Sequence, residues 1–432
     1  MGWHLPDSSR SLLTIIRLYF ILVGTVVYVT RLTEPYLRRS LAAFPAVVLS
    51  GPRQSGKTTL LRHLLAQSHA YVLLDEMDQR SFAEGDPIGF LERHPAPVIL
   101  DEIQNAPGLL PSIKARIEQD PRPGRWAITG SQRFSVMKNV SESLAGRAAI
   151  VNLHPFTFAE CQNQRPSART WDAYVDVLVA RRSNDFARTP DLGAWLLKGS
   201  YPAVWRRKNV TADLWYPSYI QAYLDRDVRG NIREANLYDF QRFLQLLAAR
   251  TAQELNQSSL ATELGITIPT IRSWISLLEA SSIVFLLPPF HRNFGKRVIK
   301  APKLYFMDTG LVCYLVGLQS AQHALDGPMA GALFETAVVS NFKKTLDAYG
   351  VRDCLYYWRA VAGLEIDLLI DRGGELLPIE IKMSSTLTPR HAAGLLAWQR
   401  LAGESSPGLI ISASRETGTM GPRIVRRHWA TI

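Results

Sequence analysis

The sequence has few cysteines: Cys161, Cys313 and Cys354 are three among 432 residues. Because they are few and scattered, they exclude a disulfide-stapled fold and a cysteine-based zinc site, and they fit a reducing compartment. Long low-complexity linkers are also lacking, since the 28 glycines and 25 prolines are spread along the chain. With 47% apolar and 20% charged residues, the chain is not of the disordered class, and its length suits two or three domains.

Acidic residues are outnumbered, because 38 Asp and Glu stand against 49 Lys and Arg and leave a formal net charge of +11. A basic surplus of this kind favours a polyanionic partner such as nucleic acid but does not establish one. DNA is therefore a candidate partner, but the net charge does not show which residues would contact it. A DNA-binding motif is needed to identify them.

A long uninterrupted hydrophobic run is missing as well, although residues 11–30 are the most apolar stretch. Arg17 divides it and leaves Leu18 to Val29, which is short for a bilayer span of about 20 residues, and no small-residue cleavage site follows. Residues 1–29 are compatible with a membrane anchor, an extra buried helix, or sequence upstream of the natural start that was translated in error. We favour the last, because the next segment leads directly into the glycine-rich motif at 51–58 that is described below. We accordingly expect a cytoplasmic protein without a stable membrane partner.

A glycine-rich loop follows a short apolar run at 46–50. Strand, loop and amphipathic helix in succession are the context that a phosphate-binding P-loop requires. The glycines let backbone N–H groups turn towards the phosphates, and the following helix adds its positive end. Lys57 would supply charge to the β- and γ-phosphates, and Thr58 a hydroxyl to Mg²⁺. The predicted ATP-binding residues are Gly51, Pro52, Arg53, Gln54, Ser55, Gly56, Lys57, Thr58 and Thr59.

Two acids, Asp101 and Glu102, end a second apolar run at 97–100. At the carboxyl end of a strand, Asp101 would hold the Mg²⁺ shell, and Glu102 would orient and polarise the attacking water. The alternative is that both acids are exposed to solvent at the end of the strand and take no part in metal binding or catalysis. Because a P-loop precedes this pair, we expect hydrolysis of ATP and not binding alone.

Apolar runs at 71–74, 98–100 and 126–129 alternate with helical stretches, which indicates a parallel sheet and an α/β P-loop NTPase fold. Ser131 or Gln132, after the third run, would lie where a γ-phosphate is sensed. Arg147 follows a glycine turn. It is either an arginine finger, acting in cis or from a neighbouring subunit of a homo-oligomer, or the end of a surface helix, and both interpretations stay open.

The combination of these motifs resembles the AAA-type ATPases of bacteria and archaea that carry a C-terminal domain of unknown function 4143. This resemblance covers most of residues 30–415 and implies an ATP site at Gly51–Thr58 and Asp101-Glu102. The segments that carry it are VVLSGPRQSGKTTLL, YVLLDE, VILDEIQ, AITGSQ, ESLAGR, LHPFTFAE at 153–160 and YLDRDV at 223–228.

The middle of the chain contains a helix-turn-helix spacing within 231–310, after a helical remainder of the ATPase and linker at 161–230. Apolar positions on either side of Gly265 suit two short helices that meet at a turn. Thr267 would cap the second helix, and Pro269 suits its first turn. The residues that this helix would present to a DNA major groove are Thr270, Arg272 and Ser273.

A hairpin is expected after these helices, at 283–303. Its second half has five basic residues and no acid, with Phe290 just before the first of them and Phe294 among them, which suits contact with a phosphate backbone. A helix-turn-helix followed by such a hairpin is a winged helix, and winged helices also bind proteins. Arg272 is the one arginine on the helix that would enter the major groove, which is few for reading DNA bases. Protein binding is therefore the alternative. The five cations are Arg292, Lys296, Arg297, Lys300 and Lys303.

Residues 311–432 are expected to form a small α/β domain. Glu335 lies on an apolar helix, and Asp367 and the Glu380-x-Lys382 pair lie on two strands, a pattern that resembles the PD-(D/E)XK nuclease core with Glu-Ile-Asp in place of Pro-Asp. The resemblance implies that Asp367 and Glu380 bind Mg²⁺, that Glu335 completes the shell, and that Lys382 positions water or phosphate. The alternatives are two amphipathic strands with solvated charges, or a nuclease-like fold without activity.

The sequence thus predicts a Mg²⁺-dependent AAA-type ATPase whose C-terminal half contacts nucleic acid. Two other interpretations are kept: a nucleotide-switched regulatory or protein-interaction protein without nuclease activity, and an ATP-dependent nuclease. The expected divisions of the chain are 1–29, 30–160, 161–230, 231–310 and 311–432.

Overall fold

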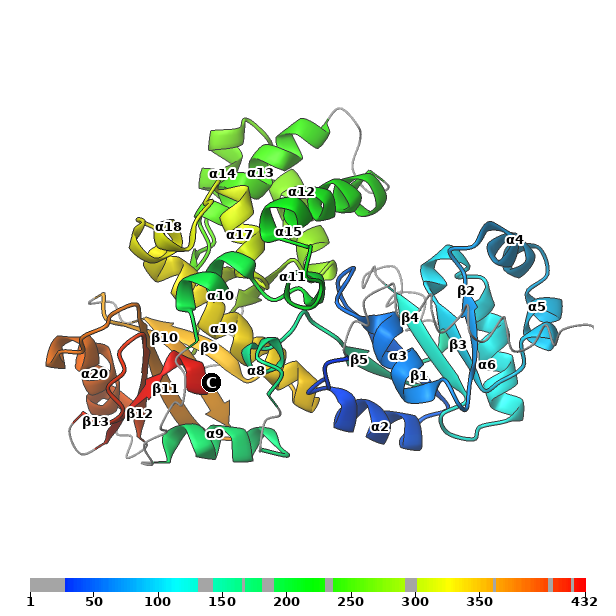
Figure 1. The fold of residues 1–432 in the computed structure, drawn as a ribbon, viewed down its shortest axis with the longest axis horizontal. Helices are drawn as coiled ribbons and strands as arrows, with labels where there is room; N and C mark the ends of the chain where they lie inside the picture. Colours follow the sequence, from blue (N-terminus) through cyan, green and yellow to red (C-terminus); the bar gives the residue numbers. More distant parts are fainter. Residues whose placement is uncertain are drawn as a thin grey trace, which may run out of the picture.

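The computed structural model shows an ATPase region, a helical middle region and a C-terminal region with its own sheet (Figure 1). The first lies on the right of Figure 1, in blue and cyan, and the other two lie together on the left, in green to red. The residues that the structure describes are 28–130, 143–164, 168–180, 190–229, 236–291, 301–359, 363–402, 407–420 and 423–432.

The ATPase region is built on a five-stranded parallel sheet in the order β2-β3-β4-β1-β5. The predicted parallel α/β fold is confirmed. Strands β1, β3 and β4 are buried along their whole length, as the apolar runs of a sheet covered on both faces should be. The strands are β1 (Ala46–Ser50), β2 (Ala70–Leu73), β3 (Val98–Asp101), β4 (Trp126–Gly130) and β5 (Ala148–Asn152).

Helices cover both faces of this sheet (Figure 1). One face packs against α2 and α3 through Leu37, Leu60 and Leu61. The other face packs against α4, α5 and α6. Their bounds are α2 (Glu34–Ala43), α3 (Lys57–Leu65), α4 (Met77–Gly85), α5 (Pro87–Arg93), η1 (Ile103–Asn105) and α6 (Leu109–Gln119).

The middle region begins as a set of helices, of which α8 lies between the two sheets and α9 lies below the C-terminal sheet in Figure 1. A π-helical turn, η2, continues α12 directly. The elements are α8 (Phe158–Cys161), α9 (Trp171–Val179), α10 (Leu192–Lys198), α11 (Pro202–Arg206), α12 (Ala212–Tyr223) and η2 (Leu224–Val228).

Five further helices and a small antiparallel sheet in the order β6-β8-β7 follow within the described residues. The expected two helices meet at Gly265, whose φ is +69°, and the Thr267 hydroxyl caps the second by accepting from the Thr270 N–H at 3.3 Å. Strands β7 and β8 pair as the expected hairpin. The elements are α13 (Leu237–Ala249), β6 (Gln253–Glu254), α14 (Gln257–Leu264), α15 (Ile268–Ala280), β7 (Val284–Leu287), β8 (Lys303–Phe306), α17 (Thr309–Leu315) and α18 (Ala321–Asp326).

The C-terminal region has a six-stranded mixed sheet in the order β13-β14-β12-β11-β10-β9. Strands β9, β10 and β11 are antiparallel, and β11, β12 and β14 are parallel. The elements are α19 (Ala330–Tyr349), β9 (Leu355–Arg359), β10 (Glu365–Arg372), β11 (Glu375–Lys382), η4 (Pro389–Ala392), α20 (Ala393–Ala402), β12 (Gly408–Ser412), β13 (Gly418–Thr419), β14 (Ile424–His428) and η5 (Trp429–Thr431).

One hydrophobic core runs through the middle and C-terminal regions, from Phe158 to Ile432. The Trp195 ring stacks on Trp429 with 5.1 Å between centroids, and Phe158 meets Trp429 edge-on at 4.9 Å. The divisions that we predicted at 161, 231 and 311 therefore do not separate independent cores, and they stay predictions about domain limits.

Tyr28 and Val29, which we had assigned to the N-terminal extension, belong to the folded ATPase region instead. The Tyr28 ring stacks on His63 at 3.7 Å, and Val29 is buried with Phe156 and Cys161. The rest of the extension, residues 1–27, lies outside the described residues. Of the helices that the structure does describe, none has the length and apolar character that a membrane crossing needs.

Candidate nucleotide-binding site

The P-loop lies where the sequence places it, between the end of β1 at Ser50 and the start of α3 at Lys57. Two of its positions require glycine. A Cβ on Gly51 would lie 2.1 Å from the Leu153 carbonyl oxygen, and Gly56 has a φ of +98° at the N-cap of α3. The backbone can therefore curve tightly enough to leave room for phosphates beside the first turn of α3.

The Lys57 amine lies within this loop. The side chain is 5% exposed, and Nζ donates to the carbonyl oxygens of Gly51 at 3.0 Å and Pro52 at 2.9 Å. The loop thus holds a positive charge at the place where a phosphate chain would bind.

Asp101 faces the P-loop from the end of β3. The Thr58 hydroxyl donates to Asp101 Oδ2 at 2.7 Å, the Tyr71 hydroxyl donates to the same oxygen at 2.7 Å, and the Thr129 hydroxyl donates to Oδ1. Asp101 is 2% exposed, so these hydroxyls replace water around its carboxylate. Burial and the hydrogen bond to Asp101 raise the pKa of Tyr71, which remains a donor at neutral pH.

Glu102 adopts a backbone conformation that is unusual for a residue other than glycine, with a φ of +62°. Its N–H donates to the Thr129 hydroxyl at 3.1 Å, and its carboxylate accepts from the Gln104 amide. Non-glycine residues in this region are strained by about 1–3 kcal/mol and concentrate at functional sites. The strained backbone turns Glu102 towards the same cavity that Thr58 lines.

A cavity of about 470 Å³ lies between the P-loop and α11. Its walls include P-loop and α3 residues, Glu102 and, from the middle region, Arg206 and Arg207. These two arginines could not be predicted from the sequence, because no motif connects α11 with a loop about 150 residues earlier. The residues that line the cavity are Tyr28, Val29, Arg31, Gln54, Gly56, Lys57, Thr58, Thr59, Glu102, Phe156, Pro202, Ala203, Arg206 and Arg207.

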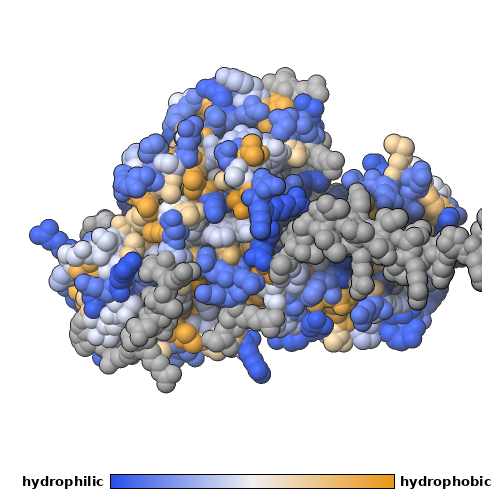
Figure 2. Space-filling model, viewed as in Figure 1, coloured by the Kyte–Doolittle hydropathy of each residue, from blue (hydrophilic) through white to orange (hydrophobic). Residues whose placement is uncertain are grey.

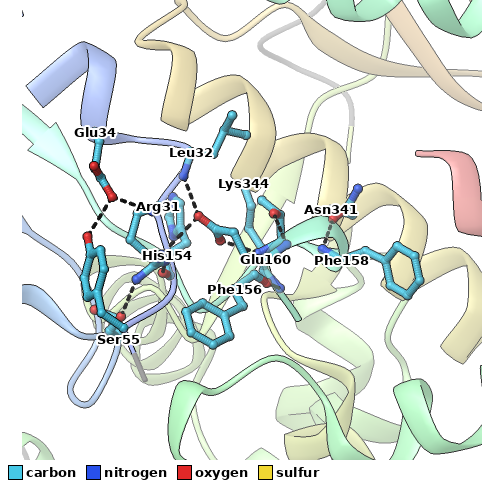
Figure 3. A network of polar contacts seen from close by, with 12 residues as sticks. Arg31, Leu32, Glu34, Ser55, His154, Phe156, Phe158, Glu160, Asn341 and Lys344 are labelled. Atoms are coloured by element: carbon cyan, nitrogen blue, oxygen red, sulfur yellow. Dashed lines mark hydrogen bonds and ion pairs between the residues drawn. The ribbon is translucent and has the colours of Figure 1, made fainter. Parts of the chain in front are cut away.

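A buried polar network joins the P-loop to the middle region and to α19 (Figure 3). Arg31 donates to the carbonyl oxygens of Ser55 at 2.8 Å and His154 at 2.7 Å, and to Glu160 at 3.0 Å. The Glu160 carboxylate also accepts from the backbone N–H of Thr157, the N-cap residue of α8, and from that of Leu32. On the far side of the network, the Phe158 N–H donates to Asn341 of α19 at 2.8 Å.

Two more contacts extend this network. The Lys344 amine on α19 donates to the Ser200 hydroxyl at 2.7 Å, and burial lowers the pKa of this lysine. Trp215 on α12 donates its indole N–H to Gln54 Oε1, in the P-loop, at 3.0 Å. Residues of the P-loop are therefore linked by hydrogen bonds to helices of the middle and C-terminal regions.

Of the other predicted ATPase residues, only Arg147 lies within the described part of the chain, and it does not join this site. Ser131 and Gln132 lie outside the described residues. Arg147 precedes β5, and its carbonyl oxygen accepts from Ala46 at the start of β1, so it lies at the sheet edge opposite the P-loop. Its side chain pairs with Glu118 at 2.9 Å. An arginine finger acting in cis is therefore incompatible with the structure, because about five residues of strand, roughly 16 Å, separate the two edges.

The helix-turn-helix residues are placed as expected, whereas part of the wing is not. Arg272 and Ser273 are exposed on α15, and Thr270 is partly exposed. Lys303, by contrast, is 5% exposed and pairs with Glu335 at 3.0 Å and with Glu365. It cannot contact a phosphate backbone from there, and our assignment of it to the wing surface is wrong.

Phe290 is also wrongly assigned to the wing surface. It is buried, and it meets Tyr356 and Trp398 edge-on in the core of the C-terminal sheet. The other wing residues, Arg292, Phe294, Lys296, Arg297 and Lys300, lie outside the described residues.

The carboxylates of the nuclease-like pattern do come together, around a lysine. Lys382 Nζ lies 3.2 Å from Asp367 and 2.7 Å from Glu380, and the Ile381 N–H donates to Asp367 at 2.8 Å. Burial, and then the charge of Asp367, raise the pKa of Glu380 to about 9 and that of Glu335 to about 7. Burial disfavours the charged form of each carboxyl, and the nearby Asp367 carboxylate disfavours it further.

The predicted Mg²⁺ shell of Asp367, Glu380 and Glu335 is not formed. Within the described residues, no three His, Cys, Asp or Glu side chains are grouped so that they could hold a metal ion. The ammonium groups of Lys303 and Lys382 pair with the carboxylates instead. Two ammonium groups of the chain are thus shared among the carboxylates of this cluster.

The parallel sheet, the P-loop and the Thr58–Asp101 contact define a P-loop ATPase domain of the AAA type. The family model for an AAA domain matches residues 43–162, and the model for the C-terminal domain of unknown function DUF4143 matches residues 330–425. A third model, for the domain of unknown function DUF8612, matches residues 189–322.

The chain belongs to the family of AAA-type ATPases with a C-terminal DUF4143 domain. Among its relatives are "Uncharacterized protein Rv2008c" of Mycobacterium tuberculosis and "Uncharacterized protein Mb2031c" of Mycobacterium bovis. Each is 30% identical over 351 residues, which are 81% of this chain and 73% of the relative.

Two solved structures show weaker similarity. The Walker-type ATPase paby2304 of Pyrococcus abyssi has 16% sequence identity and a TM-score of 0.42, over 66% of this chain and 94% of that one. The RuvB Holliday junction branch migration motor of Thermotoga maritima has 16% identity and a TM-score of 0.27, over 59% of this chain and 89% of that one.

Proposed function

We propose that the protein is a Mg²⁺-dependent ATPase whose nucleotide state is transmitted to a C-terminal half that contacts nucleic acid. The observation that carries the first part is the 2.7 Å contact between Thr58 and Asp101 beside the P-loop. It joins the P-loop hydroxyl and the strand-end carboxylate that such ATPases use for the metal.

The oxygen donors at this site fit Mg²⁺. The Asp101 carboxylate is buried among hydroxyl groups, and Mg²⁺ is usually bound by one or two protein oxygens together with substrate phosphates and water. Thr58 and Asp101 would hold the ion, which neutralises charge on the β- and γ-phosphates when bound.

The side chains around the cavity then have distinct roles. Lys57 exchanges its loop carbonyls for phosphate oxygens, because a charged acceptor makes the stronger hydrogen bond. Glu102 orients a water molecule for attack on the γ-phosphate. Arg206 and Arg207 reach the same cavity from α11 and would contact the phosphates from the middle region.

A nucleotide held between the P-loop and α11 would therefore touch two regions of the chain at once. The bonds of Arg31 to Ser55 and of Trp215 to Gln54 link the same loop to the helices behind it. Loss of the γ-phosphate would weaken the contact to α11 and leave these links in place. This difference between two states is what a nucleotide switch needs.

The contact with nucleic acid rests on the module at 237–306. Its three helices and the sheet order β6-β8-β7 support a winged helix, and Arg272 and Ser273 are exposed on the second helix of its helix-turn-helix. The surplus of basic residues, 49 against 38, favours the same partner. DNA is the partner that we propose, in the cytoplasm, where ATP is available.

ATP turnover with and without duplex DNA tests both parts. We expect Mg²⁺-dependent hydrolysis that DNA stimulates, with a steep dependence on salt. Lys57→Ala should abolish nucleotide binding, and Glu102→Gln should keep it while slowing hydrolysis by about 100-fold or more. Lys114→Ala on α6 is the matched control and should behave as the wild type.

Each result decides one part of the proposal. Absence of ATP binding in the presence of Mg²⁺ would refute the ATPase. Turnover that is indifferent to DNA at every salt concentration would refute nucleic-acid coupling and favour a nucleotide switch that acts on a protein.

A further inference from the structure

A second cavity, of about 940 Å³, lies on the other side of α11 from the nucleotide site. Its walls come from α10, α11, α12 and α17, together with the segment that joins α11 to α12. It is distinct from the P-loop and from the exposed face of α15. A cavity of this size is large enough for a nucleotide or for two adjacent nucleotides of a strand.

The walls of this cavity are strongly basic on one side. Four cations, Lys198, Arg206, Arg207 and Lys208, line it against a single acid, Asp213. Lys198, Arg207 and Lys208 are exposed. Figure 2 shows a strongly hydrophilic patch near the middle of the visible face, where Figure 1 places α11, with apolar atoms beside it. The cavity therefore attracts anions.

Aromatic rings accompany these cations. Trp205 is fixed by its indole N–H, which donates to the Gly199 carbonyl oxygen at 2.8 Å, and the Lys198 amine lies 5.3 Å from its ring centroid. Tyr314 is 37% exposed at the cavity wall and stacks on buried Tyr216. Rings beside cations are the combination that binds a base and its phosphate together.

The basic cavity also shares two side chains with the ATP site. Arg206 and Arg207 line both cavities, whereas Lys198 and Lys208 line only the second. A ligand that draws the two guanidinium groups towards one cavity changes the charge available in the other. The two cavities therefore share a wall at the end of α11, a helix of five residues that is followed directly by Arg207.

We propose that the cavity between α10, α11, α12 and α17 binds a nucleoside phosphate, as a free nucleotide or within a single strand, and that its occupancy alters ATP affinity through Arg206 and Arg207. The phosphate lies against Lys198 and Lys208, and the base lies against Tyr314. The coupling rests on the proposed ATP site, whereas the basic cavity can be tested separately.

The test uses the full-length protein with its P-loop filled by saturating Mg²⁺ and a non-hydrolysable ATP analogue. Fluorescence anisotropy then measures binding of a labelled oligothymidylate of about 12 nucleotides between roughly 50 and 200 mM salt. Lys198→Ala and Lys208→Ala should each weaken binding about 3- to 10-fold and reduce the slope of log affinity against log salt by about 0.7. Tyr314→Leu should weaken it about tenfold at all salt concentrations.

Arg38→Ala is the matched control, because it removes one exposed positive charge from α2, a helix that does not line the cavity. It should leave affinity and slope unchanged. Equal binding by the lysine variants and this control would overturn the inference, since the strand would then bind elsewhere. Thymidine monophosphate, used as a competitor, distinguishes a free nucleotide from a single strand as the ligand of this cavity. Full displacement by the monophosphate indicates a free nucleotide, and affinity that rises with oligonucleotide length indicates a strand.

Reciprocal titrations test the coupling. The oligothymidylate should change the affinity for the ATP analogue by at least about threefold, and the analogue should change oligothymidylate affinity by the same factor. Arg207→Ala should bring that factor close to one. Unchanged affinities in the wild type would overturn the coupling. Failure of the analogue to bind at all would instead refute the proposed ATPase, and the two failures are therefore distinguishable.

Discussion

Arg31→Ala tests whether the buried network of Figure 3 holds the P-loop in place. Arg31 is 5% exposed, and its partner Glu160 is 2% exposed. The substitution removes three hydrogen bonds, those to Ser55, His154 and Glu160, and leaves a buried carboxylate without its cation. Breaking a buried pair from one side costs about 3–5 kcal/mol.

The lower end of that range is expected here, because Glu160 keeps its backbone donors Leu32 at 2.6 Å and Thr157 at 2.8 Å. We therefore expect the free energy of unfolding to fall by about 3 kcal/mol. Urea denaturation followed by tryptophan fluorescence measures this as a lower midpoint with an unchanged slope. ATP affinity should fall as well, since the Ser55 carbonyl in the P-loop loses its anchor.

Two further variants show whether the geometry of the guanidinium is what matters. Arg31→Lys keeps the charge but cannot reach three acceptors that lie in different directions, so an intermediate loss is expected. Arg38→Ala, on the exposed surface of α2, should change the free energy of unfolding by no more than about 0.5 kcal/mol. An Arg31→Ala protein within about 1 kcal/mol of the wild type would refute the reasoning.

Three other outcomes are expected. Thr58→Ala should lower Mg²⁺-dependent ATP turnover by at least about tenfold. Thr58→Ser should restore it, because only the hydroxyl next to Asp101 is used. Equal turnover by the two variants would contradict the metal assignment. Gly51→Ala should reduce ATP binding in an equilibrium titration, since the added Cβ would lie 2.1 Å from the Leu153 carbonyl oxygen. ATP binding at wild-type strength would contradict this, because it would show that the P-loop relaxes freely. The buried carboxyls of Glu335 and Glu380, with pKa values near 7 and 9, bind protons in the folded chain at a pH where the unfolded chain ionises them. The contribution of these two carboxyls to stability should therefore fall as the pH rises from about 5 to 9. Histidines such as buried His154, whose pKa is lowered by burial, act in the opposite direction at the acidic end, so the test compares two proteins between pH 7 and 9. Glu380→Gln should lose less stability than the wild type over that range in thermal melts, and equal losses would contradict the reasoning.

The P-loop and the acid pair could be predicted from the sequence because each is carried by a few consecutive residues. A buried strand followed by Gly51 to Thr58, and a second strand that ends in Asp101, specify their local structure without help from the rest of the chain. Parallel pairing through β4 then brings the two ends to the same edge of the sheet.

Other parts of the site depend on contacts between distant segments, which spacing does not reveal. Arg206 and Arg207 reach the ATP cavity only because α11 packs beside the P-loop. Lys303 looked like part of a basic wing, since its neighbours in sequence are cations and its carboxylate partners come from α19 and β10. Phe290 was misassigned for the same reason, because its aromatic neighbours lie on β9 and α20 of the C-terminal region.

The stacking of Trp195 on Trp429 has a consequence for dissecting the protein. A fragment that stops before α19 would expose the indole face of Trp195, and a fragment that starts at α19 would expose that of Trp429. Neither piece should remain monodisperse alone, whereas the two pieces, expressed together, should associate through these rings. The limits of the DUF8612 and DUF4143 matches are therefore poor places to divide the polypeptide.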